Sequence, residues 1–335
     1  MIGYDHDMDN PATTIKTSRI GNGRIRLNGP KLARRAWYRQ KGFWSLTFLA
    51  LPALSFLFVF NIVPLYGLIL PFQDFSPITG LFGSPWVGFA NFKFLFNSET
   101  LFEITRNTVT MNLLFIVFNT VIGVTLAIFM TEVGKGFVKL FQTILFIPYL
   151  LSWVIISFAT LAFLNYDRGI INSVLEYFNK PPVNWYADPK PWPFIILFAE
   201  VWRIAGYAAL LYYAALMGIG AELYEAAAID GAGKLRQIFT ISIPGIMPVI
   251  IIVNVLAVGR VFNGDMGLFY NLPLNQSILY PATDVIDTYV FRALTTLNDF
   301  GMSAATGMYQ AVCGFVLVML TNWVVKKYDN DFALF

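Results

Sequence analysis

The sequence predicts an all-α integral membrane protein with six transmembrane helices. Of its 335 residues, 57% are hydrophobic and 13% are charged, and the mean hydropathy is +0.61. A soluble domain has about 25% charged and 45–50% apolar residues. Long uncharged stretches are the second observation, and an uneven distribution of basic residues is the third. Together they exclude an ordinary soluble enzyme and a disordered scaffold.

The uncharged stretches define the expected spans. A helix needs about 20 predominantly apolar residues to cross the hydrocarbon core. Five runs without charge are long enough: 42–73, 107–131, 140–166, 237–259 and 300–325. A sixth apolar segment is interrupted by Glu200 and Arg203 and is still counted as a span. The expected spans are 44–70, 107–131, 140–165, 193–217, 246–268 and 302–325.

Basic residues indicate the orientation. Six spans place the N-terminal arm 1–43, the second and fourth connections and the tail 326–335 on one side, and fifteen of the 23 lysines and arginines lie there. Cytoplasmic loops carry such an excess, so both termini are expected to be cytosolic. The arm is too long and polar for a cleavable signal peptide, and its basic, aromatic end is expected to anchor at the inner lipid headgroups.

Cysteine and histidine usage excludes several chemistries. Cys313 and His6 are the only residues of their types, which leaves no disulfide, no thiolate metal cluster and no histidine base. We therefore expect neither a catalytic site nor a metal or cofactor bound by this chain. The segment 231–234 also lacks the first glycine and the final Ser or Thr of a phosphate-binding loop. A net charge of +3 does not indicate a nucleic-acid partner.

The connection 221–244 between the fourth and fifth spans is unusual for a cytosolic loop. Residues 221–230 are strong helix formers, Gly231 and Gly233 end that helix, and apolar residues then recur at helical spacing up to Pro244. The pattern predicts a helix–turn–helix on the cytosolic face. Its apolar knob would consist of Leu223, Ala226, Ala227 and Phe239.

One ordered set of residues in this loop carries a resemblance. It is Glu225-Ala226-Ala227, three residues, Gly231, nine residues, and Ile241-x-Ile243-Pro244. This set resembles the EAA signature of permease subunits of binding-protein-dependent ABC importers, with Ile where the pattern often has Leu. Further similar segments are 86–92, Asn107-Thr108, Trp202-Arg203-x-x-Gly206-Tyr207, 284–289, 299–301 and Asn322-Trp323. They resemble the polysaccharide-permease branch of the maltose-type carbohydrate importers over residues 45–335.

The resemblance implies a type I importer fold, of the methionine- and maltose-permease kind, in a bacterial cytoplasmic membrane. The loop would insert into a cytosolic ATPase subunit, so that ATP and Mg²⁺ are bound by the partner and not by this chain. The implied contact residues are Glu225, Ala226, Ala227, Asp230, Gly231, Ile241 and Pro244. The implied partners are two ATPase subunits, a second and usually different permease, and an extracytoplasmic solute-binding protein that delivers an oligosaccharide.

Polar residues inside the spans suggest a solute path. Ionisable groups cost roughly 2.5–3.5 kcal/mol each within a membrane and tend to face a cavity or the bundle interior. The expected lining residues are Trp202, Arg203, Tyr207, Tyr212, Asn254, Arg260 and Asn263. Contacts between helices are the alternative for each of them. Glu200 and Arg203, three residues apart, are expected to pair.

Three other functions compete with this interpretation. An ion-coupled secondary transporter would show internal repeats and intramembrane carboxylates, and a membrane-integral enzyme would show clustered acids or histidines. A requirement for ATP and a binding protein in vesicle uptake would distinguish an importer from both. An ABC permease for another polar solute is the third alternative, because specificity depends largely on the binding protein.

Overall fold

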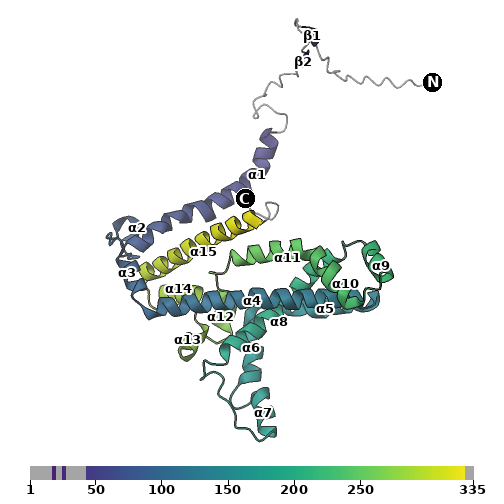
Figure 1. The fold of residues 1–335 in the computed structure, drawn as a ribbon. Helices are drawn as coiled ribbons and strands as arrows, with labels where there is room; N and C mark the ends of the chain where they lie inside the picture. The colour runs from purple at the N-terminus through teal and green to yellow at the C-terminus, as the bar shows by residue number, and fades with distance from the viewer. Residues whose placement is uncertain (1–16, 20–24, 28–42, 329–335) are drawn as a thin grey trace, which may run out of the picture. The chain divides into compact units, whose positions relative to one another are not determined.

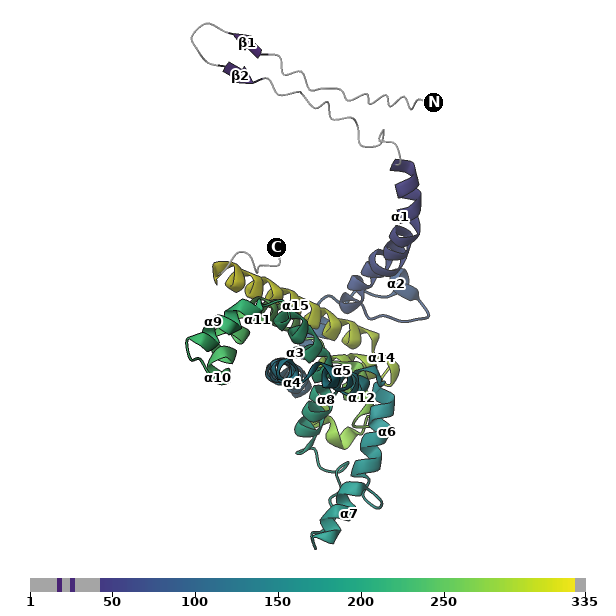
Figure 2. The ribbon, with the colours of Figure 1, turned by 90° about the vertical axis from the view of Figure 1, so that its right-hand side faces the viewer.

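The computed structural model describes residues 17–19, 25–27 and 43–328, and these parts are almost entirely helical (Figures 1 and 2). The chain divides into two compact units, Met1–Tyr66 and Gly67–Phe335. Most of the expected arm 1–43 and the end of the expected tail 326–335 lie outside the described residues.

The first unit contains a long apolar helix. A short strand β1 (Thr17–Arg19) pairs antiparallel with β2 (Ile25–Leu27). The α-helix α1 (Phe43–Leu57) continues through the π-turn η2 (Phe58–Ile62) into the 3-10 helix η3 (Val63–Phe72), which crosses into the second unit. The resulting candidate span is Trp44–Phe72, and none of the 18 residues in its most hydrophobic stretch is buried. Its apolar side chains therefore require lipid or another chain around them.

The second unit is a bundle of helices. In chain order they are α2 (Gly80–Gly83), α3 (Ala90–Phe96), α4 (Glu99–Glu132), α5 (Lys135–Leu150), α6 (Trp153–Leu164), α7 (Ile170–Tyr177), α8 (Trp192–Leu216), α9 (Ala221–Ile229), α10 (Lys234–Gln237), the π-turn η4 (Ile238–Ser242), α11 (Ile243–Val258), α12 (Met266–Asn271), the 3-10 turn η5 (Ser277–Leu279), α13 (Tyr280–Thr283), α14 (Ile286–Thr295) and α15 (Phe300–Tyr328). Over the described residues, five helices are long and apolar enough to cross a membrane, or six if one bent pair is a single span.

Close packing around α8 organises the bundle, with α4, α5 and α8 side by side (Figure 1). A Cβ on Gly123 of α4 would lie 2.9 Å from the Cβ of Ala208 on α8. A Cβ on Gly206 would lie only 1.8 Å from the carbonyl oxygen of Leu145 on α5. Small residues at these positions let the helix backbones approach, which is the usual device in membrane bundles.

The third expected span, 140–165, is not one straight helix. It consists of α5 and α6, which meet at an angle of 94°. Pro148 lacks the N–H that would continue the hydrogen-bond ladder of α5. Ser152 then caps α6, because its hydroxyl oxygen accepts a hydrogen bond from the Ile155 amide. The absence of charge in this segment could not reveal the break.

The fifth expected span, 246–268, is also displaced. The helix begins earlier, at Lys234, and ends earlier, at Val258. Residues 259–265 form a non-helical turn before α12. Side chains of neighbouring helices donate hydrogen bonds to the backbone carbonyl groups of this turn.

The bundle has two opposite ends, which we name after the helices α9 and α14. At the α9 end, Lys234 forms an ion pair of 3.1 Å with Glu132, the last residue of α4. At the α14 end, the side chain of Asn107, near the start of α4, donates hydrogen bonds to the carbonyls of Pro281 and Asp284. The α10–α11 helix begins at the first end and finishes toward the second.

Candidate functional site

The expected helix–turn–helix is present at the α9 end. Helix α9 ends at Ile229, and two residues later Gly231 has a φ of +79°, a region that glycine adopts without steric cost. The Gly231 amide donates to the Ala228 carbonyl, and the Ala232 amide donates to the Ala227 carbonyl over 2.8 Å. Helix α10 then begins at Lys234 and continues without interruption into α11.

This loop exposes apolar and acidic side chains. Glu225, Ala226 and Asp230 are exposed, whereas Ala227 and Ile241 are partly covered. Four large apolar side chains project outward, with exposed fractions of 53% to 87%: Leu223, Ile229, Leu235 and Phe239. Ile229 and Leu235 were not among the expected knob residues. An apolar protrusion of this kind marks a contact with another protein or with lipid.

Two side-chain hydrogen bonds lie within the loop itself. The Tyr224 and Ser242 hydroxyls form a hydrogen bond of 3.0 Å, and the Gln237 amide donates to the Ala232 carbonyl. The ion pair between Lys234 and Glu132 is exposed. The turn therefore depends mainly on its own backbone.

Arg203 lies at the bend between α5 and α6. Its Nε donates to the Leu151 carbonyl over 3.2 Å, and its guanidinium lies 4.5 Å from the ring centre of Trp153. Tyr207, one turn further along α8, stacks on Tyr149 of α5 at 4.8 Å. Arg203 and Tyr207 thus come together, and both contact the bend.

The expected pair between Glu200 and Arg203 is not formed. No ion pair joins them within the described part of the chain, and the Glu200 Oε2 atom is buried there without a hydrogen-bond partner. Arg203 instead satisfies a carbonyl at the end of α5, where the helix leaves such groups unpaired.

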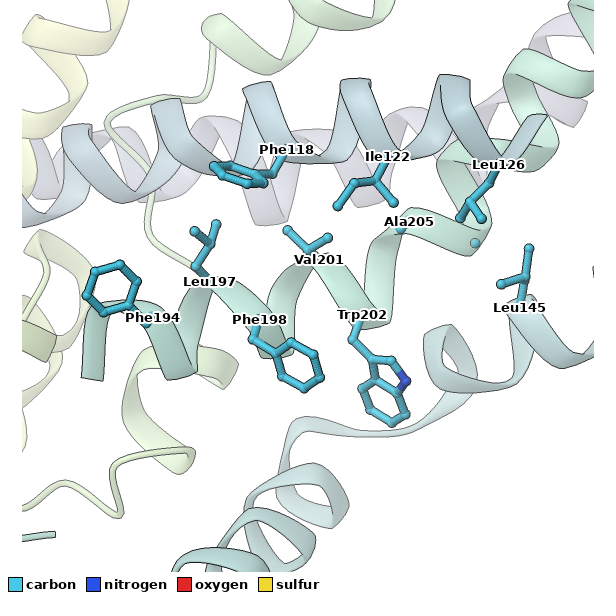
Figure 3. A pocket seen from close by; sticks show the side chains of 11 residues that line it. Phe118, Ile122, Leu126, Leu145, Phe194, Leu197, Phe198, Val201, Trp202 and Ala205 are labelled. Atoms are coloured by element: carbon cyan, nitrogen blue, oxygen red, sulfur yellow. The ribbon is translucent and has the colours of Figure 1, made fainter. Parts of the chain in front are cut away.

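Trp202 faces an apolar surface. It lines a cleft of about 440 Å³ between α4, α5 and α8, and a second cleft of about 600 Å³ between α6 and α8. Figure 3 shows Phe194, Phe198 and Trp202 projecting in a row from α8, with Phe118 of α4 across the first cleft. This surface suits acyl chains or another helix better than a sugar.

Tyr212 and Asn254 belong to contacts between helices. Tyr212 is 1% exposed and packs with Ala127, Ala208 and Ile246. The Asn254 side-chain oxygen accepts a hydrogen bond of 2.8 Å from Thr120 on α4. In this structure both residues therefore serve contacts between helices, which was the alternative to a place in the solute path.

Arg260 and Asn263 lie in the 259–265 turn, and both are exposed. Asn112 of α4 donates its side-chain amide to the carbonyls of Val261 and Asn263, at 3.0 and 3.2 Å. Asn112 was not expected from the sequence. A polar amide near the start of the expected span 107–131 was the available signal.

Asp287 of α14 holds the same turn from another side. Its Oδ2 accepts hydrogen bonds from the Gly264 amide at 2.6 Å and from Gln310 of α15 at 2.9 Å. Burial raises the pKa of the Asp287 carboxyl, while these hydrogen bonds lower it, and the net shift is upward. The two donors therefore offset part of the cost of burying this charge.

A buried ion pair fixes α14 itself. Arg292 binds both carboxylate oxygens of Asp284, and their side chains are only 15% and 6% exposed. The guanidinium also lies 4.0 Å from the ring centre of Tyr280. The Ile286 amide donates to Thr108 of α4. The segments 284–289 and Asn107-Thr108, which carry part of the resemblance, are thus in direct contact.

Comparison with known proteins agrees with this architecture. Residues 119–330 match the family described as the binding-protein-dependent transport system inner membrane component. The chain is 32% identical to the permease protein YteP of the polygalacturonan/rhamnogalacturonan transport system of Bacillus subtilis, over 85% of this chain and 89% of that protein. It is 31% identical to the protein LplB of Bacillus subtilis, over 85% and 90%.

A solved structure shares the fold. A chain of a bacterial ABC transporter involved in import of the acidic polysaccharide alginate superposes with a TM-score of 0.80 and 29% identity, covering 88% of this chain and 99% of that chain. The fold class expected from the sequence, a type I ABC importer permease, is confirmed. The chain belongs to the binding-protein-dependent transport system inner membrane component family. It is a multi-pass membrane protein and a transport subunit.

Proposed function

We propose that this chain is the permease subunit of an ABC importer that translocates an oligosaccharide, and that this oligosaccharide is acidic. The observation that carries the proposal is the exposed α9–α10 element on a chain of this family. Import of an acidic sugar is supported by two similar proteins, the permease YteP of a polygalacturonan/rhamnogalacturonan transport system and a chain of an alginate importer. A solved alginate transporter includes a periplasmic protein with bound alginate pentasaccharide.

The α9 end would be the cytosolic end and would bind the ATPase. Ile229, Leu235 and Phe239 offer an apolar knob, and Glu225 and Asp230 offer acidic groups beside it. The remaining proposed contact residues are Ala226, Ala227, Gly231, Ile241 and Pro244. Because α10 is continuous with α11, a displacement of this knob would be transmitted along one rigid helix into the membrane.

The remaining partners follow from the same arrangement. ATP and Mg²⁺ would be bound by two ATPase subunits, and this chain would contribute no catalytic residue. A second permease, different from this one, would complete the path, and a solute-binding protein would dock at the α14 end. Both termini would be cytosolic, since the α9 end also carries the basic connection after α4.

Four of the residues expected to line the solute path remain candidates in this structure. Arg260 and Asn263 are exposed at the α14 end, and Arg203 with Tyr207 lies at the α5–α6 bend. Trp202, Tyr212 and Asn254 would contribute in other states of the transport cycle, since here they serve apolar or interhelical contacts.

The test is ATPase stimulation of the complete reconstituted complex. Its binding protein, loaded with neutral or uronate oligosaccharides of equal length, should stimulate hydrolysis, and more strongly with the uronates. Uptake into vesicles should require ATP and persist when ion gradients are collapsed. Uptake driven by an ion gradient without ATP would contradict the proposal.

A further inference from the structure

The 259–265 turn follows directly on the candidate membrane span Lys234–Val258, and Gly259 is the first residue after that helix. Proline is absent between Pro248 and Pro273, so the unwinding after Val258 does not come from a missing amide. That helix is by itself long enough to cross a membrane, so the turn lies at one end of the span. Carbonyl groups outside the helix lack partners within it, and where they are buried, as at Val261, they need other donors.

Side chains of neighbouring helices supply those partners. Three consecutive carbonyls of the turn each accept a hydrogen bond from a side-chain amide. The Asn112 amide donates to the carbonyls of Val261 and Asn263, and the Gln310 amide donates to the Phe262 carbonyl at 2.9 Å. Gln310 donates at the same time to Asp287, which accepts the Gly264 amide. The backbone of the turn is therefore held from α4, α14 and α15 together.

The last residue of the turn is held as well. Trp153 of α6 donates its ring N–H to Asp265 Oδ2 over 2.6 Å, and the other carboxylate oxygen accepts from the Leu268 amide, capping α12. A Cβ on Gly264 would lie 2.7 Å from the Val285 side chain, so the backbone is also packed tightly against α14. Four helices thus fix the geometry of seven residues.

Two side chains point away from this rigid backbone. Arg260 and Asn263 are exposed, and within the described residues neither side chain has a hydrogen bond, and the Arg260 guanidinium has no ion pair. A charged group that faces lipid is costly, so it is expected to face water or an opposite charge. A guanidinium and an amide three residues apart on one turn match the carboxylate and hydroxyl groups of an acidic sugar.

We propose that residues 259–265 form a preorganised recognition turn, in which Arg260 and Asn263 bind an acidic sugar and Asn112, Asp287 and Gln310 are positioning residues. The sugar assignment rests on the proposed import function, whereas the rigid, water-facing turn does not. Holding a site rigid before binding lowers the ordering cost of binding. The positioning residues would act through the backbone of the turn and would not touch the solute.

Rigidity of the turn is tested by a spin label on Asn263→Cys, in the complete complex with Cys313→Ser removing the natural thiol. The label should be immobile, and Gln310→Leu should increase its mobility several-fold. Asp287→Asn, which keeps one acceptor oxygen, should have a smaller effect. Thr295→Ala, at an exposed position of α14, is the matched control and should have none. Unchanged mobility in the Gln310 and Asp287 variants would overturn the positioning role.

Access to water is tested with a membrane-impermeant thiol reagent. Asn263→Cys should react at least about ten-fold faster than Phe198→Cys, which is also exposed but lies on the apolar face of α8. Equal, slow labelling of both would mean that lipid or the second permease covers the turn, and would overturn the proposal.

Charge recognition is tested with Arg260→Gln. A hydrogen bond to a charged group contributes about 1.5–3 kcal/mol, so the variant should lose about ten-fold or more of its response to a uronate-loaded binding protein. Its response to a neutral oligosaccharide of equal length should be retained. Equal losses for both sugars would overturn the recognition role. If neither sugar stimulates the unmodified complex, the proposed import function fails, while the spin-label and thiol experiments still decide the turn.

Discussion

The two ends of the α10–α11 helix are held in opposite ways. At the α9 end, the Gly231 turn is stabilised by its own backbone and leaves Ile229 and Phe239 exposed. At the α14 end, the 259–265 turn is held by side chains of four other helices. The difference teaches that the geometry of one turn depends mostly on local backbone hydrogen bonds, whereas the geometry of the other depends on helices distant in the sequence. Substitutions at the α14 end should therefore affect stability first, and those at the α9 end should affect coupling first.

The largest effect is expected for Asp284→Ala at the α14 end. Removing one member of a buried ion pair leaves the Arg292 charge uncompensated and costs about 3–5 kcal/mol. The thermal unfolding midpoint of the purified complex should fall by many degrees. Thr295→Ala, at the exposed last residue of α14, should leave it unchanged. An unaltered midpoint for Asp284→Ala would show that the α14 end is not held by this pair.

Gly206→Ala tests the packing that joins the two ends. Its Cβ would lie 1.8 Å from the Leu145 carbonyl, so α5 and α8 must move apart, at a cost of about 1–3 kcal/mol or more. Both the thermal unfolding midpoint of the complex and its rate of uptake should fall. Gly136→Ala, where nothing lies within 4 Å of the added Cβ, is the control. Equal behaviour of the two variants would exclude a close approach of these helices.

Gly231→Val should separate coupling from stability. A side chain at φ +79° costs about 1–2 kcal/mol, and more for a β-branched residue. The turn should reshape, uptake should fall about ten-fold or more, and less ATPase should co-purify, with little change in the unfolding midpoint of the permease. Gly233→Ala, at a φ of −68°, should behave normally. Normal uptake and assembly of Gly231→Val would refute the coupling role of the turn.

Lys234→Ala should have the smallest effect. Its ion pair with Glu132 is exposed, with side chains 72% and 44% accessible, and such pairs contribute about 0–1 kcal/mol. The unfolding midpoint and the amount of bound ATPase should both stay close to those of the unmodified complex. A loss of ATPase with an unchanged midpoint would instead assign Lys234 a direct contact with the partner.

Local patterns in the sequence predicted much of the architecture. Uncharged runs are visible without a structure because a membrane helix must be apolar over its own length. The Gly231 turn was also predictable, since helix formers, glycines and the Glu225 to Pro244 spacing are all local. The α5–α6 bend and the early end of α11 were not, although Pro148 lies beside the first of them.

The buried polar contacts depend on residues far apart in the chain. Asn112 and Gln310 each appear in the sequence as one of several polar residues in an uncharged run, with nothing to identify a partner. In the folded chain they bind carbonyls 149 and 48 positions away, respectively. The expected pairing of Glu200 with Arg203 failed for the same reason, because the bend offered Arg203 the Leu151 carbonyl and the Trp153 ring.

The sequence by itself determined that this protein crosses a membrane in several helices, belongs with importer permeases and carries an exposed helix–turn–helix between α8 and α11. Those properties arise from hydropathy, helix propensity and glycine backbone freedom, which act over a few residues. Only the tertiary structure decided where α11 ends and which polar groups remain available to a solute. A buried carbonyl in a membrane must find a donor, and the packing of the other helices determines which donor is within reach.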